Sequence, residues 1–390
     1  MPQGSTDAEN PAAFKHAYSP AKVQAMSALL QKRLPAFQAE VFSASITPTL
    51  TDLEMKARVD LIARALRDAI PLPYPEAIAA LVSVLGPPGA IAGKDAWGPD
   101  DPSGEGLTGF AVWPVTHFVS LFGRDHHADS MAALESLTRR FTAEFALRPF
   151  LEAEPERTLA VLRTWATSPD QHLRRAASES TRPRLPWGIR LRGFVADPTP
   201  VLALIEPLRT DPEEYVRRSV ANNLNDIGKD HPQVLVEVAE RWWAEGHPAT
   251  RRLVKHALRS LVKAGHPGAL GVLGFSVPAR VQLAGLQVAH PRLVLGETQV
   301  VTGRLQSQSP GDQRLVVDYR LHLVGAKGRP RTKVFKGTLA TLSAGAVLDL
   351  RFALPIRKIT TRRYYSGLHA VEVLVCGAAC GRVEFELTVP

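Results

Sequence analysis

The stretch DPEEYVRRSVANNLNDIGKDHP, residues 211–232, combines the signals that begin, pattern and end a helix. Asp211 is a suitable N-cap, Pro212 suits the first helical position, and Gly228 ahead of Pro232 marks the end. At about 100° per residue, one face of this helix is apolar. Its members are Val216, Val220, Leu224 and Ile227. The stretch therefore predicts a bounded amphipathic helix that buries one face.

The opposite face carries amides and cations instead of the mixed Glu and Lys of an ordinary solvated face. Its members are Arg218, Asn222, Asn225 and Lys229, with Asp226 on the flank. Asparagine is a poor helix former. Poor helix formers inside a predicted helix are more typical of a functional site than of a purely structural helix. The composition of this face suits a ligand that presents a row of phosphate groups. Periodicity alone gives equal weight to a solvated face whose amides bond to neighbouring turns.

The length of 390 residues suggests two or three domains, and the net charge of +9 is unevenly spread. The formal balance is −5 over residues 1–138, +5 over residues 139–279 and +9 over residues 280–390. The positive charge of residues 139–390 favours a polyanion, most simply nucleic acid, as the partner. Because the chain has no apolar run of about 18 residues and no signal peptide, we expect a cytoplasmic protein without membrane contact.

An Arg-Arg pair recurs near the start of three amphipathic segments in the middle of the chain. The segments are HLRRAASES at 172–180, VRRSVANNL at 216–224 and TRRLVKHAL at 250–258. The Arg-Arg pairs lie about 43 and 34 residues apart. Self-similarity at such a spacing predicts stacked helix pairs of the HEAT type, which form a right-handed α-α superhelix with a concave surface. The shared helical phase predicts a basic stripe suited to a curved backbone of phosphates. Its members are Arg174, Arg175, Arg217, Arg218, Arg251, Arg252, Lys255 and Arg259.

The connector TRPRLPWGIRLRGF, residues 181–194, concentrates arginines around a single tryptophan. Pro183 and Pro186 stiffen it, because proline fixes the backbone angle φ. Trp187 has two interpretations. It is either a core anchor, which is the usual fate of tryptophan, or a platform on which a base, especially a cationic one, would stack.

A helical segment precedes the repeats, ADSMAALESLTRRFTAEFALRPFL at residues 128–151, and contains one conspicuous acid. Glu144 lies beside Phe145 on the apolar side, four residues from both Arg140 and Arg148. This spacing predicts an ion pair within the helix, which would contribute a few tenths of a kcal/mol.

Two groups of potential metal ligands occur in the chain, and neither has the spacing of a metal site. The first is Asp125, His126, His127 and Asp129 in GRDHHADS. Adjacent histidines on a turn before a helix are usually solvated, and no further ligands follow at a suitable spacing. Cys376 and Cys380 lack a second Cys or His pair, so we expect free thiols flanking a turn. No metal or cofactor is predicted.

After about residue 280 the pattern changes from helical to alternating. Strands are predicted over residues 300–305, 313–324, 332–339, 347–354 and 369–375. Turn signals occur in SPGD at 309–312 and AKG at 326–328. About seven short strands in this length indicate an immunoglobulin-like β-sandwich. Its loops are rich in Lys and Arg, which suggests a second contact with nucleic acid.

The expected fold is therefore α-helical with a separate β domain. We predict a flexible arm over residues 1–20, a HEAT-like-repeat domain over residues 21–277 and an immunoglobulin-like β-sandwich over residues 281–390. A loop rich in Gly, Pro and Asp interrupts the helices at residues 86–109.

Three strings resemble the bacterial HEAT-like-repeat alkylpurine DNA glycosylases, which are DNA alkylation repair enzymes, and specifically their AlkC branch. The strings are TAEFALRPFL, LRRAASESTRPRLPWGIRL and YVRRSVANNLNDIGKDHP. The resemblance covers residues from about 20 to 275, and the branch includes members with an appended immunoglobulin-like domain. It implies a monofunctional glycosylase that excises 3-methyladenine and 3-methylcytosine from double-stranded DNA and leaves an abasic site, without a metal or nucleotide cofactor.

The resemblance also implies roles for individual residues. Glu144 of AEFALRPF and Asp226 of NNLNDI would be the catalytic carboxylates, and Trp187 of RLPW would lie beside the lesion. Arg175, Arg182 and Arg184 would approach the DNA backbone. The basic stripe and the polar helix face, independently of the resemblance, add Arg174, Arg217, Arg218, Asn222, Lys255 and Arg259 as residues expected to bind DNA. A cationic N3-methylated base is already a good leaving group, so catalysis requires an oriented water and a stabilised sugar cation. We assign both tasks to Asp226, with Glu144 assisting.

Two other functions compete with this one. A HEAT-repeat protein could bind damaged or branched DNA without catalysis, because solenoids are scaffolds more often than enzymes. A protein-binding solenoid with an adhesion-type sandwich is disfavoured by the basic charge and the expected cytoplasmic location. For the glycosylase we expect a monomer with no obligate protein partner.

Overall fold

A computed structural model of the chain describes residues 17–89, 106–359 and 362–390. The arm expected over residues 1–20 and the loop expected over residues 86–109 lie largely outside these ranges. The chain forms two compact units, Met1–Ile227 and Gly228–Pro390. In the described ranges the first unit is helical, and the second combines helices with β-strands.

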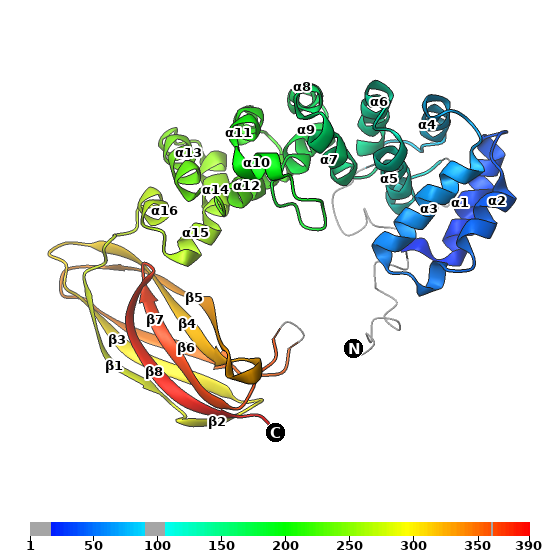
Figure 1. Cartoon of the computed structure of the whole chain (residues 1–390). Helices are drawn as coiled ribbons and strands as arrows, with labels where there is room; N and C mark the ends of the chain where they lie inside the picture. Colours follow the sequence, from blue (N-terminus) through cyan, green and yellow to red (C-terminus); the bar gives the residue numbers. More distant parts are fainter. Residues whose placement is uncertain (1–16, 90–105, 360–361) are drawn as a thin grey trace. The chain divides into compact units, whose positions relative to one another are not determined.

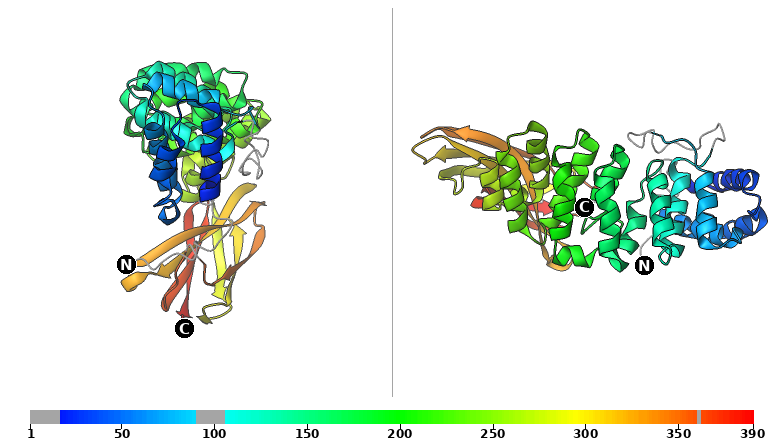
Figure 2. Two further views of the ribbon diagram at one scale, coloured as in Figure 1. Left: turned by 90° about the vertical axis from the view of Figure 1, so that its right-hand side faces the viewer. Right: turned by 90° about the horizontal axis from the view of Figure 1, so that it is seen from above.

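The first unit is a serial array of short helices, coloured from blue to green in Figures 1 and 2. Its α-helices are α1 Pro20–Arg33, α2 Ala39–Ile46, α3 Met55–Ala69, α4 Tyr74–Ser83, α5 Trp113–Phe122, α6 His127–Thr138, α7 Glu144–Ala153, α8 Pro155–Ala166, α9 Gln171–Ser180, α10 Arg192–Ala196, α11 Thr199–Ile205 and α12 Glu214–Ile227. Short 3-10 helices lie at Leu50–Asp52, Gly109–Val112 and Glu206–Thr210.

From α3 onward these helices form two layers (Figure 1). Helices α4, α6, α8 and α11 make one layer, and α3, α5, α7, α9 and α12 make the other. Within the second layer α7 contacts α9, and α9 contacts α12. This stacking of successive helix pairs confirms the HEAT-like prediction, and it places α7, α9 and α12 beside one another although they are far apart in sequence.

Helix α12 starts two residues later than its sequence predicts and ends as expected. Pro212 precedes the helix instead of occupying its first position, because Asp211 Oδ1 accepts a hydrogen bond from the backbone N of Glu213 at 2.9 Å. The carboxylate thus closes a turn ahead of the helix. The helix ends at Ile227, directly before Gly228, as the sequence predicts.

Both faces of α12 are informative. All four residues of the predicted apolar stripe are at most 1% exposed, which confirms the buried face. On the opposite face Arg218 is exposed and Asn222 is half-buried, but Asn225 and Asp226 are buried. The solvated interpretation is therefore wrong for Asn225 and Asp226, whereas Lys229, beyond the end of the helix, is exposed.

The helical segment predicted over residues 128–151 is two helices. Helix α6 ends at Thr138, and α7 begins at Glu144. Arg140 closes the end of α6, because its Nη1 donates to the carbonyl of Ser136 at 2.8 Å, as basic side chains often do at helix C-termini. The break makes Glu144 the first residue of a helix, where the helix dipole favours a carboxylate.

The second unit starts with α13 Pro232–Ala244, α14 Pro248–Ala257, α15 Arg259–Ala264 and α16 Pro267–Val272. Three of these helices begin with proline, whose missing N–H has no partner at the first position anyway. The strands follow as β1 Val281–Val288, β2 Arg292–Val294, β3 Thr298–Ser307, β4 Gln313–Val324, β5 Pro330–Leu342, β6 Val347–Pro355, β7 Gly367–Val375 and β8 Ala378–Thr388.

The strands form two sheets, ordered β1-β3-β6 and β2-β8-β7-β4-β5. Neighbours are antiparallel except for β2 and β8, which are parallel. Alternate residues are buried along β3, as expected for a strand with one face toward a core. The five predicted strands are confirmed as β3 to β7, and β1, β2 and β8 are additional. The immunoglobulin-like fold class is therefore correct.

Cys376 directly follows β7, and Cys380 lies near the start of β8. Cys376 is buried and Cys380 is half-buried, and both are free thiols, as predicted. Burial raises the pKa of both thiols, which lowers their reactivity near neutral pH.

Candidate active site

Glu144 is 4% exposed and points toward α9. Its carboxylate Oε2 accepts a hydrogen bond from Arg175 Nη1 at 3.0 Å. Arg140 and Arg148 instead donate to backbone carbonyls, so the predicted ion pair within α7 is wrong. Burial raises the pKa of the Glu144 carboxyl above its usual value, and the negative charge of Glu179 adds to this effect.

Alternating carboxylates and guanidiniums continue from Glu144 across α9 to α12. Arg175 Nη2 lies 3.7 Å from Glu179 Oε1, one helical turn further along α9. Arg182 follows α9 and bridges two acids, with Nη1 2.7 Å from Glu179 Oε1 and Nε 2.8 Å from Asp226 Oδ2. We call these side chains the carboxylate ladder. Its members in order are Glu144, Arg175, Glu179, Arg182 and Asp226.

The ladder is buried, and its charges are arranged unevenly. Glu144, Glu179 and Asp226 are 4%, 6% and 1% exposed. Burial alone would raise the pKa of Glu179, but the adjacent Arg175 and Arg182 outweigh it and hold that pKa below its ordinary value. The ladder thus has a firmly ionised carboxylate at its centre and a more basic carboxyl at the Glu144 end.

Ser219 and Asn223, which border the apolar stripe of α12, hold the ladder against α9. Ser219 Oγ donates to Glu179 Oε2 at 2.6 Å. Asn223 Nδ2 donates to the carbonyl of Ser178 at 2.8 Å and to Thr181 Oγ1 at 3.1 Å. These bonds give partners to the buried Glu179 carboxylate and to Asn223 Nδ2. They explain why asparagine, which disfavours a helix, occupies position 223.

Arg148 of α7 fixes the connector between α9 and α10. It is fully buried, and its Nη1 donates to the carbonyls of Ser180 and Arg182, each at 2.8 Å. Its Nε donates to the carbonyl of Ile189 at 2.8 Å. A Cβ on Gly188 would lie only 3.0 Å from this Nε, so the connector passes very close to the guanidinium. Burial lowers the pKa of Arg148 to about 10, with the charge of Arg182 as the next cause.

Trp187 protrudes from this connector. Its side chain is 63% exposed, so the core-anchor interpretation is wrong. Its φ is +68°, a left-handed conformation that costs roughly 1–2 kcal/mol in a residue other than glycine. Its carbonyl accepts a hydrogen bond from Lys56 Nζ of α3. Because Arg148 feels the charges of all three ladder carboxylates, the connector that carries Trp187 is held close to the ladder.

The predicted basic stripe is only partly a surface feature. Arg174 makes a two-point ion pair with Asp211, with distances of 2.6 and 3.1 Å from Nε and Nη2. Arg175 and Arg182 belong to the buried ladder. For these three residues the prediction of a solvated stripe is wrong, because each guanidinium is committed to a carboxylate.

The other predicted DNA-binding residues of the first unit are more accessible. Arg218 is exposed and pairs with Glu214 at 2.8 Å. Arg217 is half-buried and donates to the carbonyl of Pro212 at 2.8 Å. Arg184 and Asn222 are half-buried as well. Their role in DNA binding stays a prediction.

In the second unit, Lys255 and Arg259 lie on α14 and α15. Lys255 is exposed, and its Nζ lies 5.7 Å from the centre of the Trp243 ring. Arg259 is half-buried and donates from Nη1 to the carbonyl of His256 at 2.6 Å. The predicted contact of Lys255 and Arg259 with DNA also stays a prediction.

The adjacent histidines have structural roles. His127 is buried with Nε2 3.1 Å from Thr158 Oγ1, so the expectation of a solvated residue is wrong here. The His126 ring stacks on Tyr74 at 5.2 Å. Across residues 17–89, 106–359 and 362–390, no group of three or more His, Cys, Asp or Glu side chains could hold a metal ion. No helix in those ranges is long and apolar enough to span a bilayer.

Glu179 is the functional candidate that the sequence analysis missed. Arg175 lies four residues before Glu179 on the same helical face, and Arg182 lies three residues after it. Opposite charges at these spacings indicate a row of ion pairs along one face. That signal was present in the segment HLRRAASESTRPR, but the two adjacent arginines suggested a phosphate-binding stripe instead.

Comparison with known proteins covers both parts of the chain. Residues 127–261, which contain the whole ladder, match the family model of DNA alkylation repair enzymes. Residues 282–389 match the model of the C-terminal Ig-like domain of the uncharacterised protein YhaZ. The chain is 32% identical over 336 residues to the uncharacterized protein YhaZ of Bacillus subtilis (strain 168), which covers 86% of this chain and 88% of that protein.

A solved structure is similar over almost the entire chain. It is the Pseudomonas fluorescens alkylpurine DNA glycosylase AlkC bound to DNA containing an abasic site analog, and it shares 37% sequence identity with this chain. The similarity covers 96% of this chain and 99% of that one, with a TM-score of 0.85. The chain belongs to the AlkC branch of the DNA alkylation repair enzymes.

Proposed function

We propose that this protein is a monofunctional DNA glycosylase that excises cationic N3-alkylated bases, 3-methyladenine and 3-methylcytosine, and leaves abasic sites. The observation that carries the proposal is the carboxylate ladder. It brings three carboxylates into one buried row, with Arg175 and Arg182 between them and the charge of Arg148 nearby. Negative charge in a site shielded from water stabilises a developing cation far more than it would in bulk water.

The chemistry needs little more than this charge and a positioned water. As the glycosidic bond breaks, its electron pair moves to the base, which becomes neutral, and positive charge develops on the sugar. Asp226 at one end of the ladder would stabilise that cation and orient the water whose oxygen bonds to C1′. The proton released by the water passes to a carboxylate, and the raised pKa of Glu144 suits that residue to assist as the base.

Contact with DNA requires a local change around the ladder. Asp226 and Glu144 are 1% and 4% exposed in the free protein, so neither can touch a sugar as they stand. In the proposed reaction, neighbouring side chains move aside when DNA binds, while Arg182 keeps Asp226 oriented. Residues of both units would hold phosphates: Arg184, Arg217, Arg218 and Asn222 of the first, and Lys255 and Arg259 of the second.

The decisive experiment is incubation with duplex DNA that carries 3-methyladenine or 3-methylcytosine. We expect free modified base and an equal amount of abasic sites, with strand breaks only after alkali, as for a monofunctional enzyme. Undamaged duplex of the same sequence is the control. If the protein binds the damaged duplex but releases no base, the non-catalytic binding protein is the correct alternative.

Trp187→Ala should selectively weaken recognition of the lesion. Stacking of an aromatic side chain on a base contributes roughly 1–3 kcal/mol, so we expect the Kd for lesion duplex to rise about 5- to 150-fold. The Kd for undamaged duplex should change little. Ile189→Ala is the matched control, because Ile189 is also exposed, at 45%, two residues away. Equal effects of both substitutions would show that Trp187 does not contact the lesion.

A further inference from the structure

Trp187 occupies the third position of a tight turn in the connector between α9 and α10. The backbone N of Gly188 donates to the carbonyl of Leu185 at 3.1 Å, which closes a β-turn over residues 185–188. The φ of +68° at Trp187 is that of the third residue of a type II turn, a position that ordinarily holds glycine. Because this conformation is strained in tryptophan, it persists only where the surrounding structure holds it.

One side of the turn is anchored in the packed interior. Arg148 is fully buried and donates from Nε to the carbonyl of Ile189 at 2.8 Å. Gly188 passes so close to this anchor that a Cβ on it would lie 3.1 Å from Arg148 Cδ and 3.2 Å from Leu185 Cδ2. The end of the turn that follows Trp187 therefore has little room to move.

The other contact comes from a residue 131 positions earlier in the chain. Lys56, the second residue of α3, donates from Nζ to the carbonyl of Trp187. The carbonyl carbon and the Cβ of Trp187 are bonded to the same Cα. A donor that fixes the carbonyl therefore also limits the directions in which the exposed indole can project.

An exposed lysine of a DNA-binding protein would ordinarily be expected to bind a phosphate. Lys56 is exposed, but it lies outside the basic stripe of Arg-Arg pairs. Its partner is a backbone carbonyl, and that carbonyl belongs to the strained residue of the turn. This partner makes the conformation of Trp187 depend on Lys56.

We propose that Lys56 is a positioning residue for Trp187, whose hydrogen bond holds the indole in its projecting orientation before DNA binds. A side chain that is ordered in advance meets its ligand at a lower entropic cost. The inference rests on the proposed function, in which Trp187 stacks on the alkylated base. Lys56 then affects recognition of the lesion only through Trp187.

The first test is made on the free protein and needs no DNA. The chain has six tryptophans, and incorporation of 5-fluorotryptophan gives each of them a fluorine resonance. Trp187→Phe identifies the resonance of Trp187 by its loss. Lys56→Met removes the donor and should shift or broaden that resonance, whereas Lys56→Arg retains a donor and should leave it in place. An unchanged resonance in Lys56→Met overturns the proposal.

The second test compares the Kd for undamaged duplex with that for lesion duplex, made with a 2′-fluorinated nucleotide that resists hydrolysis. Lys56→Met should raise the Kd for lesion duplex about 2- to 12-fold, the effect of losing one hydrogen bond, and leave undamaged duplex unchanged. In the Trp187→Ala protein the same substitution should have no further effect, because the residue that Lys56 positions is gone.

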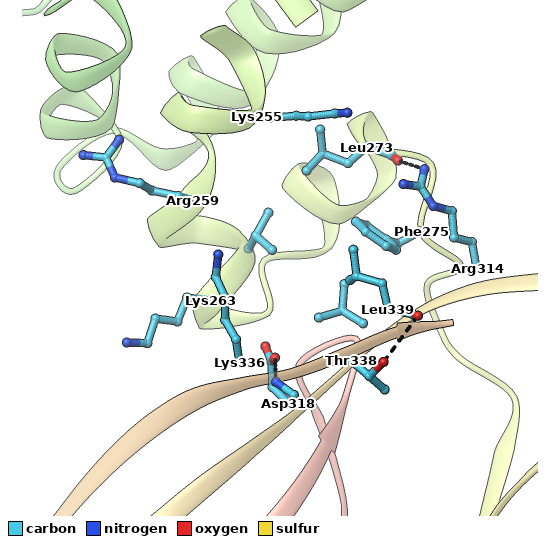
Figure 3. Close-up of a pocket in the computed structure, with 13 residues that line it drawn as sticks. Lys255, Arg259, Lys263, Leu273, Phe275, Arg314, Asp318, Lys336, Thr338 and Leu339 are labelled. Carbon is cyan, nitrogen blue, oxygen red and sulfur yellow. Dashed lines mark hydrogen bonds between the residues drawn. The ribbon is translucent and has the colours of Figure 1, made fainter. Parts of the chain in front are cut away.

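Lys255→Met shows what the loss of a phosphate contact looks like. Lys255 is a predicted phosphate contact and one of the residues that line a hollow of about 330 Å³ in the second unit (Figure 3). Its substitution should weaken binding of both duplexes equally and lower the slope of log K against log salt by about 1.

The positioning role of Lys56 is overturned if Lys56→Met behaves like Lys255→Met, changes neither Kd, or still weakens lesion binding in the Trp187→Ala protein. Failure of the proposed function is a different result. It is the absence of base release from the unmodified protein, and it leaves the dependence of the Trp187 resonance on Lys56 as measured.

Discussion

Asp226→Asn should lower the rate of base release from 3-methyladenine DNA by about 10²- to 10³-fold, which is the usual effect of removing one electrostatic stabiliser of a transition state. The substitution keeps the size of the side chain and removes its negative charge. Arg182 Nε can still donate to the remaining oxygen, as it does to Asp226 Oδ2 at 2.8 Å, so the geometry should survive. Single-turnover kinetics would isolate the chemical step.

Binding provides the internal control for this variant. Asp226→Asn should bind a duplex with an uncharged abasic site analogue about as tightly as the unmodified protein, because the analogue has no developing sugar cation and Asp226 is not among the predicted phosphate contacts. Glu214→Gln, at an exposed position on the same helix, should release base at the normal rate. A rate for Asp226→Asn within about threefold of the normal rate would remove Asp226 from the mechanism.

Much of the fold could be predicted because its signals are local. Gly228 marks the end of α12, and the apolar period of Val216, Val220, Leu224 and Ile227 reports a buried face directly. The strand β4 is found at its predicted residues because turn signals bound it on both sides. The end of α6 was missed, since the apolar period continues from one helix to the next.

The ladder could not be predicted in the same way, because its contacts join residues far apart in sequence. Periodicity placed Arg175 on a helical face and composition placed Arg182 in the connector, but neither could show that Glu144 and Asp226 lie opposite them. An arginine that faces solvent and one that faces a buried carboxylate have the same local pattern. Only the packing of α7, α9 and α12 decides between a phosphate contact and an ion pair.

Glu179→Ala should be among the most destabilising single substitutions in the first unit. Glu179 is the shared partner of Arg175 and Arg182, and it also accepts a hydrogen bond from Ser219. Removing one member of a buried ion pair typically costs about 3–5 kcal/mol, because the remaining charges stay buried without compensation. The free energy of unfolding from urea titration would measure this. Glu214→Ala is the control, because its exposed pair with Arg218 should contribute at most about 1 kcal/mol.

The pH dependence separates the charge of Glu179 from its packing. Arg175 and Arg182 hold its pKa below the ordinary value, so its charge contributes stability above the pKa of the unfolded chain, and this is lost as the pH falls through the folded-state pKa. The difference in unfolding free energy between the unmodified protein and Glu179→Gln should therefore be largest near neutral pH and shrink on acidification. A difference that is independent of pH would mean that Glu179 acts through shape and hydrogen bonding, and that the ladder does not depend on its central charge.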